Sequence, residues 1–406
     1  MPQLTVLLLE NIHRVAEAHL VERGLVVKRV NAALKEDELA KHLEGVHLLG
    51  IRSKTNVTKK VLEAPQAKDL LAIGAFCIGT NQIALEAAAK RGVAVFNAPF
   101  SNTRSVAELV MAEIVMLSRQ LGDRSREVHQ GVWRKTATGS NEVRGKTLGV
   151  VGYGHIGSQV GILAEAFGMK VIFFDIAAKL PLGNTQAAPA LDALLAQSDF
   201  VTLHVPETPQ TKGMMGAAQL AQMKKGAMLI NASRGTVVDI DALADAIKRE
   251  HIRGAAIDVY PEEPESSDTK GFVTPLQNLP NVVLTPHIGG STAEAQENIG
   301  REVAGALSRF ASQGSTAGSV NLPQVELALT PGTWRLAHVH QNVPGVLRDV
   351  NRVVGDAGAN IHAQVLSTTA DLGYLLMDLD SNLTEQVVEG LKKLPTTIQA
   401  RVVPGD

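Results

Sequence analysis

Residues 147–175, TLGVVGYGHIGSQVGILAEAFGMKVIFFD, decide the fold of this chain. An apolar run at 148–151 meets the glycine-rich segment GYGHIG at 152–157, and apolar residues at helical spacing follow it. A second apolar run, 171–174, ends on Asp175. The order of strand, glycine-rich turn, helix, strand and acid predicts the first half of a doubly wound, Rossmann-like domain.

Each part of this unit has a task in holding a dinucleotide. Gly152 permits the tight turn, Gly154 lets a pyrophosphate approach the backbone, and Gly157 lets the helix pack closely on the strand. The start of the helix offers free N–H groups and a positive dipole end to the phosphates. Asp175 can accept hydrogen bonds from both ribose hydroxyls and would repel a 2′-phosphate. The sequence therefore predicts NAD rather than NADP as the cofactor.

The composition is that of an ordinary globular protein. A length of 406 residues predicts two or three domains, and 45% hydrophobic residues suffice for their cores. A net charge of −2 argues against nucleic acid or a membrane surface as the main partner. Cys77 is the one cysteine, so no intramolecular disulfide forms, and the first residues lack the features of a signal peptide. We therefore expect a soluble cytoplasmic protein.

Three segments with different patterns follow one another along the chain. Residues 1–101 alternate apolar runs with amphipathic stretches, and with a returning helix in 291–325 they are expected to form a substrate-binding domain. Residues 102–290 hold the dinucleotide unit. After a small-residue linker at 313–319 (QGSTAGS), residues 333–406 follow the order βαββαβ of a ferredoxin-like module. The predicted fold class is α/β, with two doubly wound parallel-sheet domains and a C-terminal ferredoxin-like domain.

Polar side chains follow several predicted strands of the dinucleotide domain, where ligands bind in such sheets. His287 is the candidate base, because the histidine side chain can take a hydroxyl proton near neutrality. Glu263 can hold the other ring nitrogen, and Arg234 can bind a carboxylate and polarise the neighbouring carbonyl. Asp258 either contacts the cofactor or only holds backbone groups in place. Each residue alone has a plain structural interpretation, but together they predict one catalytic group.

Four polar residues outside that group are expected at the substrate. Arg52 and Ser53 follow a strand predicted at 46–51, and Asn102 precedes a long helix as a cap or a ligand. Lys135 follows a Gly-Val-Trp-Arg segment. The basic side chains of Arg52 and Lys135 suit an anionic substrate. No cluster of His, Cys and Glu has the spacing of metal ligands, so no metal is expected.

The chain resembles the D-specific 2-hydroxyacid dehydrogenase family over residues 47–325. The resemblance is carried by GYGHIG at 152–157, NASRG at 231–235, Asp258, Glu263 and PHIGG at 286–290. It implies Arg234, Glu263 and His287 as the catalytic set. The cofactor contacts that we predict are Gly152, Gly154, His155, Ile156, Gly157, Asp175, His204, Val205, Pro206, Ala232, Ser233, Arg234, Asp258, His287, Gly289 and Gly290.

The C-terminal segment LAHVHQNVPGVL at 336–347 resembles an ACT domain, a module that binds small amino acids. Together the resemblances imply oxidation of 3-phospho-D-glycerate to 3-phosphooxypyruvate with NAD, the first step of L-serine synthesis. They also imply a homotetramer that L-serine inhibits by binding at His340, Asn342 and Asn360 between paired ACT domains. The family often has a Gly-Gly hinge before this domain, whereas this chain has Pro331-Gly332-Thr333, a stiffer joint that bears on the strength of inhibition.

Two other functions are open at this point. A related reductase of glyoxylate, hydroxypyruvate or 2-oxoglutarate would use the same catalytic set, although Arg52, Lys135 and the ACT-like module argue against a neutral substrate. An NAD-sensing transcriptional corepressor shares the fold and binds protein partners, but it has no need of an amino-acid-binding module. Reduction of NAD with phosphoglycerate, with and without L-serine, separates these functions.

Overall fold

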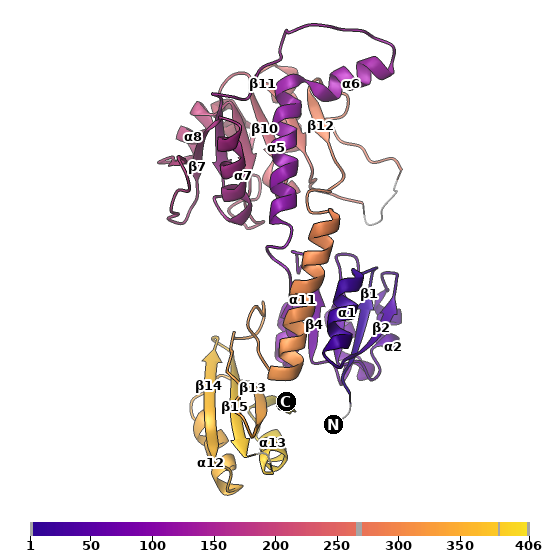
Figure 1. The fold of residues 1–406 in the computed structure, drawn as a ribbon, viewed down its shortest axis with the longest axis vertical. Coiled ribbons are helices and arrows are strands. Elements are labelled where there is room, and N and C mark those ends of the chain that lie inside the picture. Colours follow the sequence, from indigo (N-terminus) through magenta and orange to yellow (C-terminus); the bar gives the residue numbers. More distant parts are fainter. Residues whose placement is uncertain (1–2, 265–269, 381, 404–406) are drawn as a thin grey trace. The chain divides into compact units, whose positions relative to one another are not determined.

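The computed structural model describes residues 3–264, 270–380 and 382–403. It contains two compact units, one made of Met1–Ser101 with Gln296–Asp406 and the other of Asn102–Ala295. Figure 1 labels elements of both units where there is room, and we describe the two units separately. The predicted division into three domains stays a prediction, and its outer ends, residues 1–2 and 404–406, lie outside the described residues.

The second unit, Asn102–Ala295, is a doubly wound sheet of seven parallel strands in the order β12-β11-β10-β9-β6-β7-β8. The strand order reverses between β6 and β9, which pair directly. In such sheets the ligand crevice lies at this reversal, outside the carboxyl ends of the strands. The strands are β6 (Thr147–Val151), β7 (Lys170–Phe174), β8 (Gln186–Ala187), β9 (Phe200–Leu203), β10 (Ala227–Asn231), β11 (Ile252–Ile257) and β12 (Val282–Leu284).

Helices cover both faces of this sheet because successive strand residues point to opposite sides. Met228 and Ile230 of β10 pack in the core with helices α5 and α7, whereas Leu229 packs in the core with α8, α9 and α10. The apolar residues at 106, 109, 110, 114 and 117 have helical spacing and predict α5, and this is confirmed, since Val110 and Ile114 are fully buried. The helices are α5 (Thr103–Arg119), α6 (Leu121–His129), α7 (His155–Ala166), α8 (Leu191–Gln197), α9 (Ala217–Gln222) and α10 (Ile240–Lys248).

The first unit, Met1–Ser101 with Gln296–Asp406, contains a five-stranded parallel sheet in the order β2-β1-β3-β4-β5, the other common doubly wound arrangement. The strand β2 has no clear apolar pattern in the sequence, because its residues VVKRV are exposed or half-buried at the sheet edge. The elements are β1 (Thr5–Leu9), α1 (Arg14–Glu22), β2 (Val26–Val30), α2 (Glu36–His42), β3 (Leu48–Ile51), α3 (Lys59–Glu63), β4 (Ala72–Ala75), α4 (Leu85–Lys90) and β5 (Ala94–Phe96).

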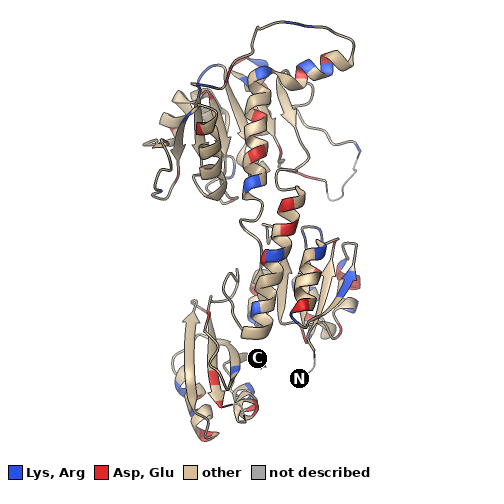
Figure 2. Ribbon diagram, in the orientation of Figure 1, with Lys and Arg blue, Asp and Glu red and all other residues tan. Residues whose placement is uncertain are grey.

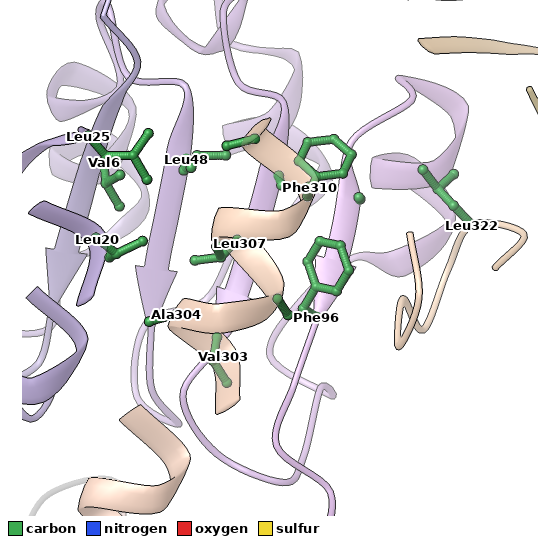
Figure 3. Packing of buried hydrophobic residues seen from close by; sticks show 14 of the residues in the cluster. Val6, Leu20, Leu25, Leu48, Phe96, Val303, Ala304, Leu307, Phe310 and Leu322 are labelled. Carbon is green, nitrogen blue, oxygen red and sulfur yellow. The ribbon is translucent and has the colours of Figure 1, made fainter. Parts of the chain in front are cut away.

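The long helix α11 (Ala293–Gln313) packs its apolar side onto this sheet (Figure 3). Phe310 of α11 faces Phe96 of β5, with ring centroids 5.8 Å apart. Gly74 in β4 lets the helix come close, because a Cβ there would lie 2.6 Å from a methyl group of Val303. The predicted return of this helix to the first segment of the chain is therefore confirmed.

The end of the first unit is a four-stranded antiparallel sheet in the order β14-β15-β13-β16, with the chain order βαββαβ that the sequence predicted. The spacing of Asn382 and Glu385 in the sequence predicts a capping pair at the start of the last helix, and this prediction is wrong. The residue before α13 is Leu383, which makes no side-chain cap, and the hydroxyl of Thr384 turns back to the Asp380 carbonyl. The elements are β13 (Thr333–Gln341), α12 (Val346–Asp356), β14 (Ile361–Thr368), β15 (Leu372–Asp380), α13 (Thr384–Lys392) and β16 (Thr397–Val403).

The segment 313–319, predicted as a linker, is packed into the first unit. Thr316 is fully buried, and the carbonyl of Gly314 accepts a hydrogen bond of 2.7 Å from the Tyr374 hydroxyl. Ser319 forms an antiparallel bridge with Phe96 of β5. Small residues serve close packing here, since a Cβ at Gly314 would lie 2.8 Å from Leu376. Composition alone did not distinguish this use of small residues from flexibility.

Charges of both signs are mixed on the helices, as Figure 2 shows for α5 and α11. This mixing agrees with the net charge of −2. Within the described part of the chain, no helix combines the length and apolar character needed to span a membrane.

Candidate active site

The glycine-rich turn lies at the strand-order reversal of the second unit, between the end of β6 and the start of α7. Gly152 has a φ of 90°, and a Cβ on it would lie 2.4 Å from the His204 carbonyl oxygen. A Cβ on Gly157 would lie 2.1 Å from the Gly152 oxygen, so the helix can approach the turn only without one. A Cβ on Gly154 would meet nothing within 4 Å. The turn thus leaves open space in front of the helix N-terminus, where a pyrophosphate fits.

Asp175 follows β7, and its carboxylate is fixed beside this turn. One oxygen accepts the Tyr153 N–H at 2.8 Å, and the other accepts the Ala177 N–H at 2.9 Å. Each carboxylate oxygen has a second lone pair, so the group can also accept hydrogen bonds from two hydroxyls. The contact of Asp175 with the ribose of a dinucleotide stays a prediction.

His204 follows β9 on the other side of the reversal. Its Nε2 pairs with the Thr202 hydroxyl at 2.9 Å, and burial lowers the pKa of His204 to about 3, so the ring stays neutral. The ring is therefore held against its own strand, and the backbone of His204 packs against Gly152. The next two residues, Val205 and Pro206, continue along the carboxyl edge of the sheet.

Arg234 lies on a turn that the end of β10 builds. The Asn231 side chain accepts the N–H and hydroxyl of Ser233 at 3.1 and 2.8 Å, and it donates to the Arg234 carbonyl at 3.0 Å. A Cβ on Gly235 would lie only 1.9 Å from the backbone of Tyr260. Glycine at this position therefore lets the turn that carries Arg234 pack directly on the turn after β11.

That second turn carries Glu263. One oxygen of its carboxylate accepts the Tyr260 N–H at 3.1 Å, and the other pairs with His287 Nδ1 at 2.8 Å. The Tyr260 hydroxyl donates to two backbone carbonyls, at Ile257 and Thr285, which ties the ends of β11 and β12 together. The elements after three neighbouring strands thus bring Arg234, Glu263 and His287 into one group.

His287 has a φ of 54°, which is unusual for a residue other than glycine, and Asp258 holds it in that conformation. The Asp258 carbonyl accepts the His287 N–H at 2.8 Å. The Asp258 carboxylate accepts the N–H groups of Ile288 and Gly289, both at 2.8 Å, and the Thr285 hydroxyl at 2.6 Å. Asp258 is 1% exposed, so its contacts are those of a residue that shapes the loop.

The carboxylates of this group raise the pKa of His287, whereas burial and the positive charge of Arg234 lower it by less. The hydrogen bond to Glu263 raises the pKa of His287, and the negative charges of Glu263 and Asp258 act in the same direction. Burial alone would raise the pKa of Glu263, but hydrogen bonds from His287 and Tyr260 lower it below its ordinary value. A histidine held by an ionised carboxylate in this way can take up and release a proton near neutrality.

Comparisons with known proteins agree with this geometry. The model of the D-isomer specific 2-hydroxyacid dehydrogenase NAD-binding domain matches residues 111–289, and that of the AHAS small subunit-like ACT domain matches residues 336–399. The chain is 51% identical to D-3-phosphoglycerate dehydrogenase of Dictyostelium discoideum, over 99% of this chain and 97% of that protein. It is 52% identical to D-3-phosphoglycerate dehydrogenase of Escherichia coli K12, over 98% and 97%. The chain belongs to the D-3-phosphoglycerate dehydrogenase family.

Solved structures of the wider family share the fold. D-2-hydroxyisocaproate dehydrogenase superposes with a TM-score of 0.71 at 26% identity, covering 78% of this chain and all of that one. The protein is therefore an NAD-dependent oxidoreductase with a C-terminal ACT-like domain. The family, the fold class and the cofactor predicted from the sequence are confirmed. The individual site residues stay predictions.

The residues predicted to bind substrate are distributed over both units. Arg52 and Ser53 lie on the loop after β3 in the first unit. Asn102 precedes α5 but makes no side-chain cap, and its buried Oδ1 has no hydrogen-bond partner among the described residues. Lys135 lies on an exposed loop between α6 and β6, and no described hydrogen bond ties it to the catalytic group. Glycine at 290 lets the Asn102 amide lie next to the loop that carries His287.

The residues predicted to bind serine lie on the ACT-like sheet. His340 is 4% exposed, and its ring fills the space over Gly373. Asn342 is exposed after β13, and its side-chain amide donates to the Thr369 carbonyl at 2.8 Å. Asn360 is exposed before β14, and its N–H donates to the Asp380 carboxylate at 2.8 Å.

Two residues that hold loops with predicted site residues, one in each unit, were not predicted from the sequence. Asn231 builds the Arg234 turn, and Glu10 accepts three N–H groups from the loop that carries Arg52. The signal for Asn231 was its place at the start of the NASRG motif. Glu10 ends an apolar strand and precedes Asn11, which looks like an ordinary turn.

Proposed function

We propose that this enzyme oxidises 3-phospho-D-glycerate to 3-phosphooxypyruvate with NAD, the first step of L-serine synthesis. The observation that carries the proposal is the pairing of His287 with Glu263 at 2.8 Å, next to the Arg234 turn, in the NAD-binding unit. The relatives that match nearly the whole chain carry the name D-3-phosphoglycerate dehydrogenase. Arg52, Ser53, Asn102 and Lys135 belong to the proposal as substrate ligands.

In this mechanism His287 acts as the general base. Its Nδ1 is committed to Glu263, so Nε2 takes the proton from the substrate hydroxyl as the carbonyl forms. Bound NAD supplies the acceptor for the hydride that leaves the same carbon. Glu263 stabilises the imidazolium, and Arg234 binds the substrate carboxylate with two parallel hydrogen bonds. In the reverse direction His287 returns the proton to the carbonyl oxygen.

The test is NADH absorbance with a panel of substrates. We expect 3-phospho-D-glycerate to reduce NAD with a kcat/KM well above those of unphosphorylated D-2-hydroxy acids. Glyoxylate, hydroxypyruvate and 2-oxoglutarate are assayed in the reverse direction against 3-phosphooxypyruvate. His287→Ala should lose about 10²–10⁴-fold in turnover while it still binds NADH. A wild-type enzyme that prefers an unphosphorylated substrate would contradict the proposal, and an active His287→Ala would exclude His287 as the base.

The proposal includes inhibition by L-serine through the ACT-like domain. Asn342 and Asn360 lie near opposite ends of the nine-residue strand β15, about 27 Å apart at about 3.4 Å per residue. A serine site that uses both residues therefore needs a second copy of the chain. The outer strand β14 has a free edge on which two such sheets can meet about a two-fold axis.

This part of the proposal has its own test. Calorimetry should show L-serine binding to the wild-type enzyme and no binding to Asn342→Ala, with Asn382→Ala as a matched control on the same domain. Gel filtration should give a homotetramer, and cell fractionation a cytoplasmic enzyme. An active enzyme that neither binds L-serine nor slows in its presence would leave the ACT-like domain with an assembly role alone.

A further inference from the structure

Glu10 is a buried acid at the end of β1 that contacts the loop after the neighbouring strand β3. Glu10 is 8% exposed and has a φ of 58°, a backbone conformation that residues other than glycine rarely adopt. One carboxylate oxygen accepts the N–H groups of Arg52 and Thr55 at 3.1 and 2.9 Å. The other accepts the Lys54 N–H at 3.0 Å. A single carboxylate thus accepts hydrogen bonds from three N–H groups of the four-residue loop 52–55.

Three backbone N–H groups that converge in this way form a nest for an anion. Here the anion is part of the chain itself, and charge-assisted hydrogen bonds of this kind are about twice as strong as neutral ones. The other side of the loop is also held, because the Gln82 side-chain amide donates to the Arg52 carbonyl at 2.8 Å. The backbone of residues 52–55 therefore has little freedom, although the side chain of Arg52 is partly exposed.

We propose that Glu10 is a positioning residue for the substrate: it fills the nest of residues 52–55 and so orients the side chains of Arg52 and Ser53 toward the substrate anion. The inference rests on the proposed function for the part that concerns phosphoglycerate. Because the internal carboxylate occupies the N–H groups, the anion is bound by side chains rather than by the backbone. Glu10 itself does not touch the substrate in this scheme.

The first experiment compares Glu10→Gln and Glu10→Ala with the wild-type enzyme. An amide keeps the size of the carboxylate but offers one acceptor oxygen and turns an N–H₂ group toward the loop. We expect the KM for 3-phospho-D-glycerate to rise at least about tenfold in both variants, as misplacement of a binding group predicts. The KM for NAD and kcat should stay within about twofold of wild type. Glu17→Gln is the matched control, since it breaks a partly exposed ion pair with Arg29 in the same unit.

A second measurement uses formate, which is a free carboxylate of the size that Glu10→Ala removes. Formate should lower the raised KM of Glu10→Ala toward the wild-type value and should leave wild type and Glu10→Gln unchanged. Unchanged phosphoglycerate KM values in both Glu10 variants would overturn the inference. An equal rise in the KM values for phosphoglycerate and NAD would overturn it as well, because that pattern belongs to a general defect of folding.

Amide hydrogen exchange makes the test independent of the substrate. The N–H groups of Arg52, Lys54 and Thr55 should be protected in the wild-type enzyme and exchange faster in Glu10→Gln, while Glu17→Gln keeps them protected. Wild-type amides that exchange at the rate of an open loop would overturn the inference. Failure of wild type to oxidise phosphoglycerate overturns the proposed function instead, and the exchange result then decides whether Glu10 holds the loop.

Discussion

Arg335 and Asp378 form a buried ion pair whose loss should unfold the ACT-like domain more readily than any surface substitution. Both residues are at most 1% exposed. The guanidinium Nε and Nη2 donate to the two carboxylate oxygens at 2.7 and 2.9 Å. The guanidinium also donates to the carbonyls of Gln313, Leu327 and Ala328, at 3.1, 2.7 and 2.8 Å. The Arg335 side chain of β13 thus binds the backbone of the segment that precedes this strand.

The magnitude follows from what Arg335→Met leaves behind. The Asp378 carboxylate would stay buried with the Thr330 N–H, at 3.2 Å, as its remaining described donor. Removing one partner of a buried pair costs about 3–5 kcal/mol because the other charge is left uncompensated. Arg335→Met with Asp378→Leu removes that charge. The double variant should therefore be more stable than the sum of the two single effects predicts, by about 2–3 kcal/mol.

The assay is urea unfolding followed by the fluorescence of Trp334, which lies in β13. A Trp133→Phe background removes the second tryptophan, which is 82% exposed. Arg301→Met is the control, since the pair of Arg301 with Glu297 is 2.6 Å long but exposed, and its loss should change the stability little. A cost below about 1 kcal/mol for Arg335→Met, or strict additivity in the double variant, would refute the reasoning.

Three further predictions concern the second unit. Burial, with the charge of Asp258 in addition, raises the pKa of Glu113 from 4.5 to about 8. Between pH 4.5 and about 8 only the folded state keeps the proton, so the free energy of unfolding should fall as the pH rises. The fall should be about 1.4 kcal/mol per pH unit, or about 5 kcal/mol over the whole range. In urea unfolding, Glu113→Gln should abolish this dependence on pH. The hydrogen bond that His287 donates to Glu263 raises the pKa of His287, so Glu263→Gln should move the acidic limb of the kcat/KM profile for alcohol oxidation to lower pH. An unmoved limb would contradict the pairing. Asp175→Ala should raise the KM for NAD and narrow the preference over NADP, and equal use of both cofactors by the wild-type enzyme would show that the ribose assignment is wrong.

Much of the fold could be predicted because periodicity and glycine spacing are local signals. The GYGHIG segment predicted a strand, a turn and a helix, and β6, the turn and α7 have that order. The edge strand β2 escaped prediction because Lys28 and Arg29 interrupt its apolar pattern. The segment 313–319 was misjudged because a small residue in a loop and a small residue in a close contact have the same composition.

That Arg234, Glu263 and His287 lie close together could be predicted for a different reason. Few residue types can move a proton or bind a carboxylate, and only a few residues of these types follow a predicted strand. Positioning residues have no such signature, because an acid that accepts backbone N–H groups has the same side chain as a solvated one. The prediction that Asn382 caps the last helix is wrong because the backbone places Leu383, and not Asn382, at the N-cap position of α13.

The two parallel sheets position their polar loops by the same device. In the second unit Asp258 follows β11, and its carboxylate accepts two N–H groups of the loop after the neighbouring strand β12, which carries His287. In the first unit Glu10 follows β1, and its carboxylate accepts three N–H groups of the loop after the neighbouring strand β3, which carries Arg52. In both cases a buried acid holds the backbone of a loop that carries side chains predicted to meet a ligand. The acid that ends one parallel strand should therefore be considered together with the loop after its neighbour when a site of this kind is sought in a sequence.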